Sequence, residues 1–355
     1  MKVFHCDHCE QLLFFENVDC VRCGRALAYV PELGALTSLD PIGGYRWTSP
    51  MAPPGDVFRL CGNYSQHNVC NWALPDSDPH TLCRACRLTR TIPNLSREGN
   101  ARLWYKLEVA KRRVVYTLAQ LGLAHESKAD DPGRGLIFDF LEDPGPYSSA
   151  GCVLTGHRDG VITVNLAEAD DAERVKRRTQ LGEPYRTLLG HFRHEVGHYY
   201  WDRLIRDENR LDPFRALFGD ERADYQAALQ RHYQGGPIVG WQQGYVSAYA
   251  TMHPWEDWAE TWAHYLHMTD TLETAAECGI SLRPPRKDEP TLKTVPNPAA
   301  DDSVSFDRMI ESWRAITYVL NNLNRGLGTD DAYPFVLSTP SVEKLRFVHE
   351  TIGQR

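Results

Sequence analysis

The sequence predicts an α+β fold in which a small mixed sheet packs against helices, preceded by two small modules that bind metal through cysteines. Three observations support this prediction. Eight of the ten cysteines lie before residue 90, and four of those form two Cys-x-x-Cys pairs within the first 25 residues. Two short apolar segments in the middle of the chain have the composition of strands. From "RLWYKLEVAKRRVVYTLAQLGL" onward, apolar residues recur at helical spacing.

The bulk properties of the chain indicate an ordinary globular protein. It has 355 residues, of which 42% are hydrophobic and 24% charged, enough for one large core and one or two small modules. The sequence shows neither an apolar run of about 18 residues nor a secretory signal, so we expect a cytoplasmic protein without membrane contact. The formal net charge of -8 argues against a protein whose main task is to coat nucleic acid.

The first module, expected over residues 1–33, is a four-cysteine zinc ribbon of the rubredoxin-like kind. Two Cys-x-x-Cys turns can aim four thiolates at one tetrahedral zinc ion, and in a reducing compartment this pattern indicates metal rather than disulfides. A segment of this length cannot bury enough apolar surface to fold alone. The metal would therefore supply its stability. His5 or His8 could replace a ligand. The expected ligands are Cys6, Cys9, Cys20 and Cys23.

The second module, expected over residues 34–95, holds the next four cysteines after a connector rich in proline and glycine. Its first two cysteines are spaced too widely for a Cys-x-x-Cys turn, so "CGNYSQHNVC" must loop out and return before four thiolates can meet. His67 or His80 could compete as a ligand. The basic run over residues 84–113 more often marks a solvated helix face than a nucleic-acid patch. We expect a second structural zinc at Cys61, Cys70, Cys83 and Cys86.

The third unit, residues 96–355, is expected to carry the sheet and most helices. "LIFDFL" and "VITVNLAEAD" are typical of strands, and "GHRDG" is expected as the tight turn before the second. That second strand, with Asn165, could be an edge strand along which a peptide pairs, or an ordinary structural strand. Beyond Glu183 the chain is mainly helical. Helices are expected over Tyr185–Arg206, Glu221–Tyr233 and Trp255–Thr269, and within Ser303–Arg325 and Ser341–Ile352.

The stretch "LLGHFRHEVGHYYWDRL" carries the pattern with the clearest chemistry. On a helix, His194 and His198 lie one turn apart on the same face, so both imidazoles can bind one metal ion. Glu195 sits one residue further round, where its carboxylate can act as a general base toward a metal-activated water. We therefore expect a catalytic zinc site. A chance match and a purely structural helix are the alternatives.

A catalytic zinc takes three protein ligands and keeps one position open, so a third ligand must lie elsewhere. Leu204 stands where the metzincin pattern would place a third histidine, which excludes that class. The stretch "SAYATMHPWEDWAETWAHYLHM" offers Glu256 and Glu260 on one face of a predicted helix. Among mostly bulky apolar neighbours these carboxylates would need a partner, and a metal ion is a natural one. Asp257 and His264 are lesser candidates.

This arrangement resembles the gluzincin metallopeptidases, in which a second helix supplies a glutamate ligand and an acidic residue one turn later holds a zinc-binding histidine. The resemblance implies that Glu256 is the third zinc ligand. It also implies that Glu260 is the second-shell partner that fixes the tautomer of His194 or His198.

Tyr249 precedes Glu256 by seven residues. A similar tyrosine precedes the ligand glutamate in lethal-factor-type gluzincins, where it can donate its hydroxyl to the developing oxyanion. The resemblance therefore implies a catalytic role for Tyr249, with Tyr245 as the competing candidate. A tyrosine of the core is an equally compatible interpretation.

Nearly the whole chain resembles a bacterial family of zinc-binding metallopeptidases with an N-terminal zinc-ribbon domain. The resemblance rests on the ribbon, the His-Glu-x-x-His helix, "PWEDWAE" and "NNLNRGLGTDDAYPFVLS". It implies a zincin-like metallopeptidase domain that hydrolyses peptide bonds of a peptide or protein substrate. The implied cofactor is Zn²⁺, at one catalytic and two structural sites, and the ribbons would recruit the substrate or a partner.

A different hypothesis is a zinc-ribbon protein that binds nucleic acid or another protein, with a zincin-like domain that is only a scaffold. The ribbon segment "CDHCEQLLFFENVDC" is acidic, so only the basic run over residues 84–113 favours nucleic acid. An intermediate hypothesis follows from analogy with SprT-like proteases, which pair a similar zinc-binding helix with a ribbon. In that case the ribbons would direct the protease to DNA-bound or protein-bound substrates.

Overall fold

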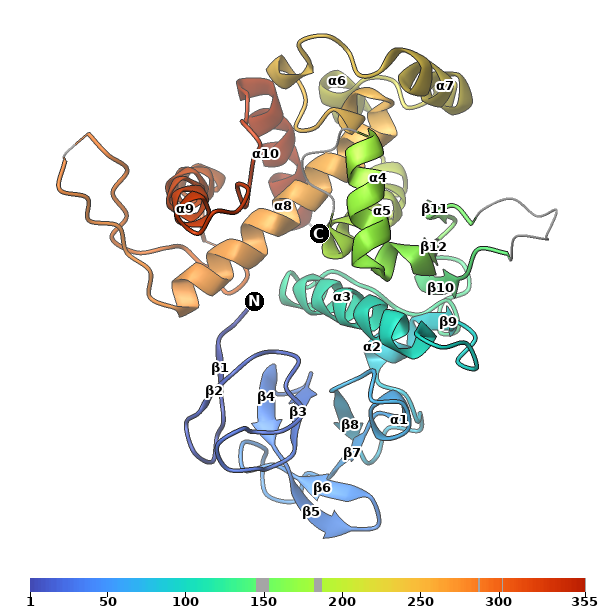
Figure 1. Ribbon diagram of the computed structural model, residues 1–355, viewed down its shortest axis with the longest axis vertical. Helices are drawn as coiled ribbons and strands as arrows, with labels where there is room; N and C mark the ends of the chain where they lie inside the picture. The colour runs from blue at the N-terminus through green and yellow to red at the C-terminus, as the bar shows by residue number, and fades with distance from the viewer. Residues whose placement is uncertain (145–152, 182–186, 287, 302, 355) are drawn as a thin grey trace.

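The computed structural model describes residues 1–144, 153–181, 187–286, 288–301 and 303–354. Figure 1 shows a strand-rich N-terminal part at the bottom and a helical part above it. Helix α3 (Asn100–Gln120) lies between the two parts. Among the described residues, none of the helices combines the length and the apolar character that crossing a bilayer requires.

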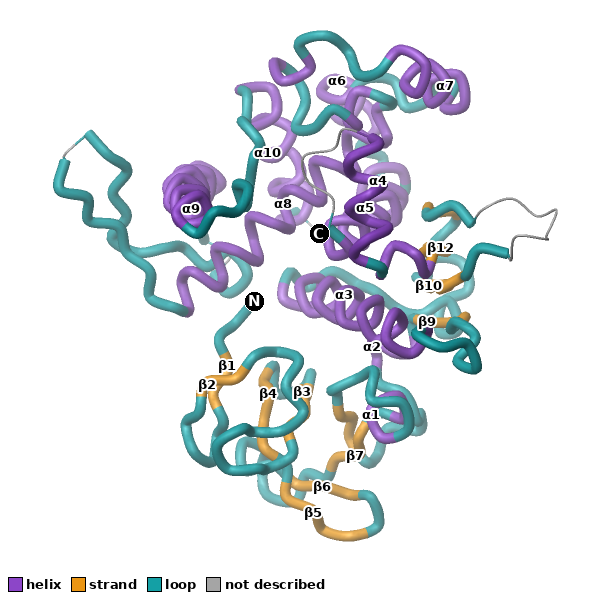
Figure 2. Tube along the Cα trace, in the orientation of Figure 1, coloured by secondary structure: helices purple, strands orange, loops and turns teal. Residues whose placement is uncertain are grey.

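The N-terminal part consists of short antiparallel strands, drawn in orange in Figure 2. They are β1 (Phe4–His5), β2 (Leu12–Leu13), β3 (Leu27–Val30), β4 (Ala35–Ser38), β5 (Asp40–Gly43), β6 (Arg46–Thr48), β7 (Phe58–Leu60) and β8 (Ala73–Pro75). The pairs β1–β2 and β3–β4 form two-stranded sheets, and β5 to β8 form a four-stranded sheet. Every residue of β3 is buried, and the Tyr29 ring packs against Trp72 and Tyr116. These aromatic contacts join the N-terminal part to α3.

A second four-stranded sheet lies at the edge of the helical part. Its strands are β9 (Thr89–Thr91), β10 (Ile137–Leu141), β11 (Gly156–Arg158) and β12 (Val161–Asn165), in the order β11-β12-β10-β9. Strand β10 runs parallel to β9 and β12, whereas β11 is antiparallel to β12. The expected small mixed sheet and the α+β class are therefore confirmed.

Two expectations about this sheet are wrong. The stretch "GHRDG" is not only a turn, because its first three residues form β11 and only Asp159 and Gly160, both with positive φ, make the turn. The strand expected over residues 161–170 ends at Asn165, whose side chain accepts a hydrogen bond from the Ala167 amide and begins a 3₁₀ turn. Of the two alternatives left open for this strand, an edge strand or an ordinary structural strand, the structure shows the second, because β12 lies between β11 and β10.

The helical part places two long helices across each other. The helices after α3 are α4 (Asp171–Leu181), α5 (Leu188–Trp201), α6 (Leu211–Phe218), α7 (Tyr225–Gly235), α8 (Pro254–Glu277), α9 (Phe306–Gly326) and α10 (Thr339–Gly353). Helix α5 begins later than expected because Thr187 caps it, accepting a hydrogen bond from the Gly190 amide. The helix was expected to begin at Tyr185, but residues 185 and 186 lie outside the described part of the chain. Helix α5 continues into a π-helical turn, Asp202–Arg206.

Helices α5 and α8 approach each other closely at Gly197. The Trp258 indole donates a hydrogen bond of 2.8 Å to the Gly197 carbonyl oxygen. A Cβ atom built on Gly197 would lie 3.0 Å from the Ala259 Cα and 3.2 Å from the Trp262 Cβ, closer than ordinary van der Waals contact. Trp258 and Trp262 are fully buried at this crossing. The missing side chain of Gly197 therefore sets the distance between the two helices.

Replacing Gly197 by alanine should destabilise the protein although alanine favours helices. The extra methyl group would push α5 and α8 apart in a tightly packed core, at a cost of about 1–3 kcal/mol. Urea denaturation would measure this loss. As a matched control, Gly326→Ala in α9 adds a Cβ with no atom within 4 Å and should leave stability equal or higher. A Gly197→Ala protein as stable as the wild type would contradict the prediction.

Candidate metal centres

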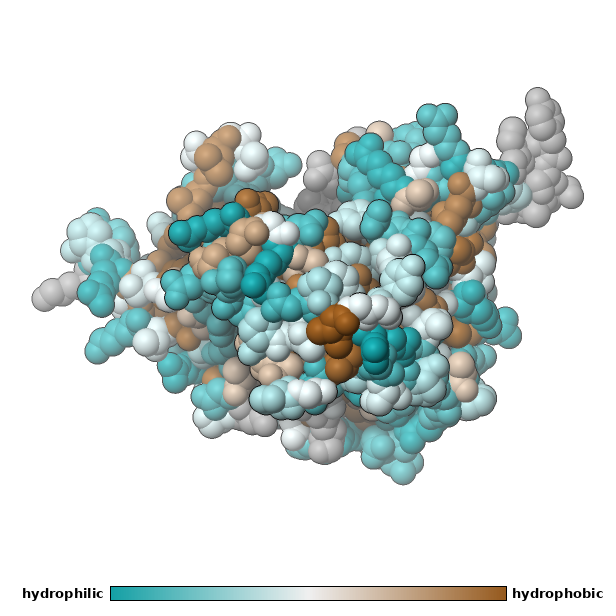
Figure 3. Space-filling model, turned by 90° about the horizontal axis from the view of Figure 1, so that it is seen from below, coloured by the Kyte–Doolittle hydropathy of each residue, from teal (hydrophilic) through white to brown (hydrophobic). Residues whose placement is uncertain are grey.

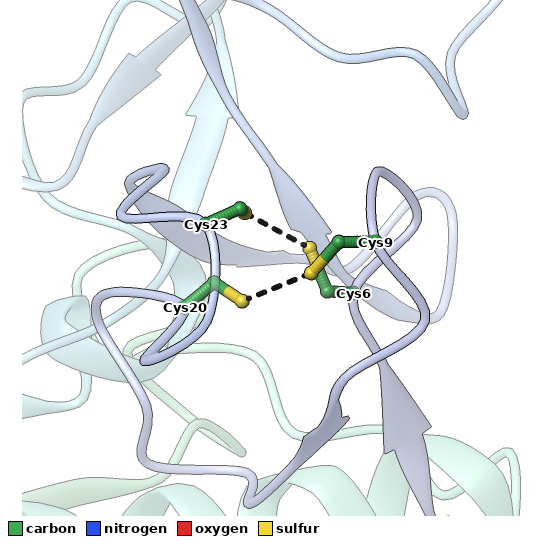
Figure 4. Close-up of side chains that lie close together, drawn as sticks. All are labelled: Cys6, Cys9, Cys20 and Cys23. Carbon is green, nitrogen blue, oxygen red and sulfur yellow. Dashed lines mark hydrogen bonds between the residues drawn. The ribbon is translucent and has the colours of Figure 1, made fainter.

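The first candidate metal centre is the group of Cys6, Cys9, Cys20 and Cys23 (Figure 4). The Sγ atoms of Cys6 and Cys23 are 3.8 Å apart, and those of Cys9 and Cys20 are 3.5 Å apart. A disulfide would need about 2.05 Å, whereas four sulfurs around one tetrahedral zinc lie about 3.8 Å from each other. The group has the size of a zinc site and contains neither His5 nor His8.

The backbone explains how the two Cys-x-x-Cys turns form. The amide of Glu10 donates to the Cys6 carbonyl and that of Gly24 to the Cys20 carbonyl, both at 2.8 Å. Both donor residues have positive φ, which glycine adopts without strain. The two turns therefore face each other with their thiols converging.

The second candidate centre is the group of Cys61, Cys70, Cys83 and Cys86, which is fully buried. The segment "CGNYSQHNVC" loops out through α1 (Gly62–Ser65) and returns, as expected, while α2 (Arg84–Arg87) carries Cys86. Two backbone amides donate to sulfur, Trp72 to Cys70 and Cys83 to Cys61. His67 and His80 lie elsewhere, because their rings contact Trp104 and the Asp78 carboxylate. Both four-cysteine groups suit zinc.

The third candidate centre joins α5 and α8. Here Nε2 of His194 lies 2.9 Å from Oε2 of Glu256 and 3.2 Å from Nε2 of His198, which is 3.4 Å from the same Glu256 oxygen. Ligand atoms around one tetrahedral zinc are about 3.3 Å apart at bond lengths near 2.0–2.1 Å. The three atoms therefore have the spacing that a metal ion requires. These are the residues expected as ligands from the sequence.

Hydrogen bonding leaves the Glu256 oxygen that faces the histidines without a donor. Oε2 of Glu256 is buried and has no hydrogen-bond partner among the described residues. His194 uses Nδ1 for a hydrogen bond to Oε1 of Glu260, at 2.6 Å, so its Nε2 faces the centre. Burial opposes a charge on His194, but the contacts with Glu256 and Glu260 raise its pKa well above the usual value. The site thus favours a cation between these groups, and a metal ion would meet the same demand.

Glu260 contacts the ring of His194, as expected from the resemblance stated for the sequence. Besides the bond to His194, it accepts a hydrogen bond of 2.5 Å from the Ser247 hydroxyl. Burial alone would raise its pKa, but these bonds and the charge of His194 lower the pKa of Glu260 to about 2. The carboxylate therefore stays ionised and can hold the His194 ring in one orientation.

Glu195 is buried beside the three converging atoms. Its Oε2 has no hydrogen-bond partner within the described part of the protein. Burial raises the pKa of Glu195, although the nearby His194 and His198 act in the opposite direction. A buried carboxylate without a fixed partner and with an elevated pKa has the properties of a general base.

The two candidate tyrosines occupy different places. The Tyr249 ring lies in a 3₁₀ turn (Tyr249–Thr251), with its centroid 6.0 Å from that of His194. The Tyr245 ring instead lies under the ammonium group of Lys344, 4.3 Å from its centroid. Tyr249 is therefore the tyrosine of this pair that borders the histidines.

The lesser candidates for a third ligand point elsewhere. Asp257 forms an ion pair of 2.5 Å with Lys344 of α10. His264 makes a hydrogen bond of 2.6 Å with the Tyr333 hydroxyl. Neither belongs to the group of converging ligand atoms.

Sequence reasoning missed two contributors to the site, Tyr225 and His157. The Tyr225 hydroxyl of α7 donates a hydrogen bond of 2.8 Å to Oε1 of Glu256. The rings of Trp255 and His157 lie 3.9 Å and 6.3 Å from the His198 ring, and burial lowers the pKa of His157 to about 3. No spacing rule links Tyr225 or β11 to the His-Glu-x-x-His helix, so no sequence signal marked them.

Comparisons with known proteins bear on most of the chain. A family model described as "Putative zinc-binding metallo-peptidase" matches residues 100–351, and a zinc-ribbon domain model matches residues 3–97. Uncharacterised proteins from Mycobacterium bovis and Mycobacterium tuberculosis are each 43% identical over 355 residues. The alignments cover 100% of this chain and 96% of each relative. No solved structure matches.

The helical part containing the three converging ligand atoms is the part that the metallopeptidase model matches. The part with the two four-cysteine groups is the part that the ribbon model matches. The chain therefore belongs to the family of zinc-binding metallopeptidases that carry an N-terminal zinc-ribbon domain.

Proposed function

We propose that this protein is a zinc-dependent endopeptidase of gluzincin type. The observation that carries the proposal is the convergence of His194, His198 and Glu256 beside the buried carboxylate of Glu195, whose Oε2 has no hydrogen-bond partner in the described part of the chain. A structural zinc site would use four protein ligands, whereas three ligands leave a position for water and substrate. Membership of the metallopeptidase family supports a peptide or protein as substrate.

Zinc at this site would supply Lewis-acid activation of a water molecule and of the scissile carbonyl. Glu195 then accepts the proton of the attacking water and passes it to the leaving amine, so the base is restored after each turnover. Glu260 keeps Nδ1 of His194 engaged and directs Nε2 at the metal. Tyr249, which borders His194, donates its hydroxyl to the oxyanion that develops on the carbonyl.

The N-terminal modules complete the proposal. We assign residues 1–33 and 34–95 to two zinc modules and residues 96–355 to the zincin-like peptidase domain, with two structural zinc ions and one catalytic ion. Figure 3, seen from the side of the N-terminal modules, shows apolar side chains among mainly hydrophilic ones. In the first module the exposed apolar residues are Leu12, Phe14, Val18 and Val21. They favour recruitment of a protein rather than nucleic acid by this module.

Metal content should separate the catalytic site from the structural ones. Elemental mass spectrometry on the wild type should find close to three zinc ions per chain, with one in each of the three groups. The His194→Ala/His198→Ala double variant removes two of three ligands and should retain two. Two ions in both proteins would mean that the His-Glu-x-x-His helix holds no tightly bound metal, and the proposed function would fail.

Glu195→Gln should abolish peptide hydrolysis while zinc stays bound. The amide keeps the shape of the side chain but cannot accept a proton, so the rate should fall by about 10²–10⁴-fold. Hydrolysis of fluorogenic casein, with zinc content measured in parallel, tests this. Glu208→Gln, an exposed position that follows α5 and its π-helical turn, is the matched control and should keep full activity. Undiminished hydrolysis by Glu195→Gln would overturn the assigned role.

A further inference from the structure

Helix α7 reaches the catalytic site through its first residue, Tyr225, and through His232, whose ring centroid lies 5.7 Å from that of Tyr249. Ala228 is the only buried residue of α7, all of which is described, so the helix has little core of its own. Its first residue, Tyr225, packs its ring against His253 and Trp255 at centroid distances of 5.3 and 6.1 Å. Its hydroxyl donates to Oε1 of Glu256 at 2.8 Å. The start of α7 is therefore linked directly to the carboxylate of Glu256, a proposed zinc ligand.

Two further contacts fix where the Tyr225 hydroxyl can lie. Asp224 caps α7, accepting a hydrogen bond of 3.0 Å from the Ala227 amide. His253, which caps α8 by accepting a hydrogen bond from the Trp255 amide through Nδ1, donates through Nε2 to the Ala223 carbonyl at 3.0 Å. One histidine thus ties the start of α7 to the start of α8. The helix that carries Tyr225 and the helix that carries Glu256 are therefore joined both by His253 and by the hydrogen bond between Tyr225 and Glu256.

The two oxygens of Glu256 consequently have different surroundings. Oε2 faces the Nε2 atoms of His194 and His198, while Oε1 is occupied by the Tyr225 hydroxyl. A carboxylate with both oxygens free could rotate or bind a metal through both, taking the position that water needs. A hydrogen bond to Oε1 restricts that rotation and leaves one oxygen for the metal.

We infer that Tyr225 is a positioning residue that holds Oε1 of Glu256 so that Oε2 alone serves as the zinc ligand. The inference rests on the proposed function, since it requires Glu256 to bind zinc. Tyr225 acts through Glu256 and leaves the role of oxyanion donor to Tyr249. Because the hydroxyl supports a ligand directly, its loss should weaken zinc binding more than it weakens the fold.

Tyr225→Phe removes the hydroxyl and keeps the ring. Titration with a chelator should show zinc affinity at the catalytic site about 10–100-fold lower. With Co²⁺ in place of zinc, the visible absorption spectrum should change, because the carboxylate can then bind through both oxygens. Tyr233→Phe, an exposed tyrosine on the same helix, is the matched control and should match the wild type in both measurements.

The outcomes separate this inference from the proposed function. If the wild type lacks a third metal ion, both are overturned. If the wild type binds three ions and Tyr225→Phe has an unchanged affinity and Co²⁺ spectrum, only the role of Tyr225 is overturned. If Tyr225→Phe and Tyr233→Phe lose affinity equally, the effect belongs to α7 as a whole, which also overturns it.

A second inference comes from a buried arginine beneath the second four-cysteine group. Arg112 of α3 is 1% exposed and donates a hydrogen bond to the carbonyl of Val69, the residue before Cys70. Its neighbours Glu108 and Lys111 are 0% exposed and form an ion pair of 2.8 Å with each other. Their charges cancel, so the buried cluster keeps one positive charge.

The charge of the cysteine group decides whether that positive charge is balanced. With four neutral thiols, the two buried cations Lys111 and Arg112 would share the single carboxylate of Glu108, a costly arrangement in a protein interior. Four thiolates around Zn²⁺ carry a net charge of about −2, by simple charge counting for a four-cysteine site. Burial lowers the pKa of Arg112, but attraction to Cys70, Glu108, Cys86 and Cys83 raises it overall.

The first four-cysteine group does not need a buried positive charge to balance it. Its Cys9 and Cys23 are partly exposed, so water can solvate the charge of a zinc-thiolate cluster there. The second group is buried and is followed directly by the peptidase sheet. Cys86 lies in α2, and the Leu88 carbonyl that follows accepts a hydrogen bond from the Phe138 amide of β10.

We propose that Arg112 is the charge partner of the zinc-loaded second four-cysteine group, which makes this zinc site part of the core of the peptidase domain. The second module and the peptidase domain then fold together although their motifs are separate. The first module can lose its metal independently. This inference does not depend on peptidase activity.

Site-resolved cysteine alkylation under increasing chelator tests the role of Arg112. Arg112→Gln replaces the charge by a neutral polar group. In this variant the cysteines of the second group should become reactive at a chelator concentration at least about tenfold lower than in the wild type. Arg112→Lys keeps the charge and should retain most of the protection. Arg113→Met, which breaks a surface ion pair with Glu16 on the same helix, is the control. In all four proteins the first group should respond alike.

Two results would overturn this proposal. If Arg112→Gln protects the second group as well as the wild type does, the charge is not needed. If Arg112→Lys and Arg112→Gln lose protection equally, the role of Arg112 is packing rather than charge balance. Urea denaturation with excess zinc, run on the same variants, shows whether each one is folded when its cysteines are probed.

Discussion

The site depends on how closely α5 and α8 can approach. Glu256 lies three residues before Ala259, the residue whose Cα would meet a side chain at position 197. Any widening of this crossing would therefore carry Glu256 away from the two histidines of α5. Glycine at position 197 costs helix propensity, and the buried tryptophans of α8 and the indole bond to the Gly197 carbonyl offset that cost.

A second layer of contacts orients the ligands once the helices are in place. Glu260 and Ser247 hold His194, while Tyr225 holds the far oxygen of Glu256. These groups come from α8, from the segment before it and from α7. In each of these contacts a buried carboxylate meets a hydrogen-bond donor, which reduces the cost of keeping ionisable side chains inside a domain.

The sequence made the convergence of the candidate ligands predictable because local geometry sets their spacing. Two histidines four residues apart share a helix face, and Cys-x-x-Cys turns converge on one point, whatever the rest of the fold does. Strand order and contacts between distant segments follow from tertiary packing instead. For that reason the sequence left open whether the strand containing Asn165 is an edge strand, and it gave no sign of Tyr225. The alternation of apolar residues is the same in an inner strand and an edge strand.

The long segment between the ligand helices has a consequence for chain entropy. Residues 199–255, including α6 and α7, separate His198 from Glu256. An ion bound by both residues closes this loop as a covalent cross-link would, which reduces the freedom of the unfolded chain by about 4 kcal/mol for a loop of this length. The proposed catalytic ion would thus also restrict a segment that includes α7, a helix with Ala228 as its single buried residue.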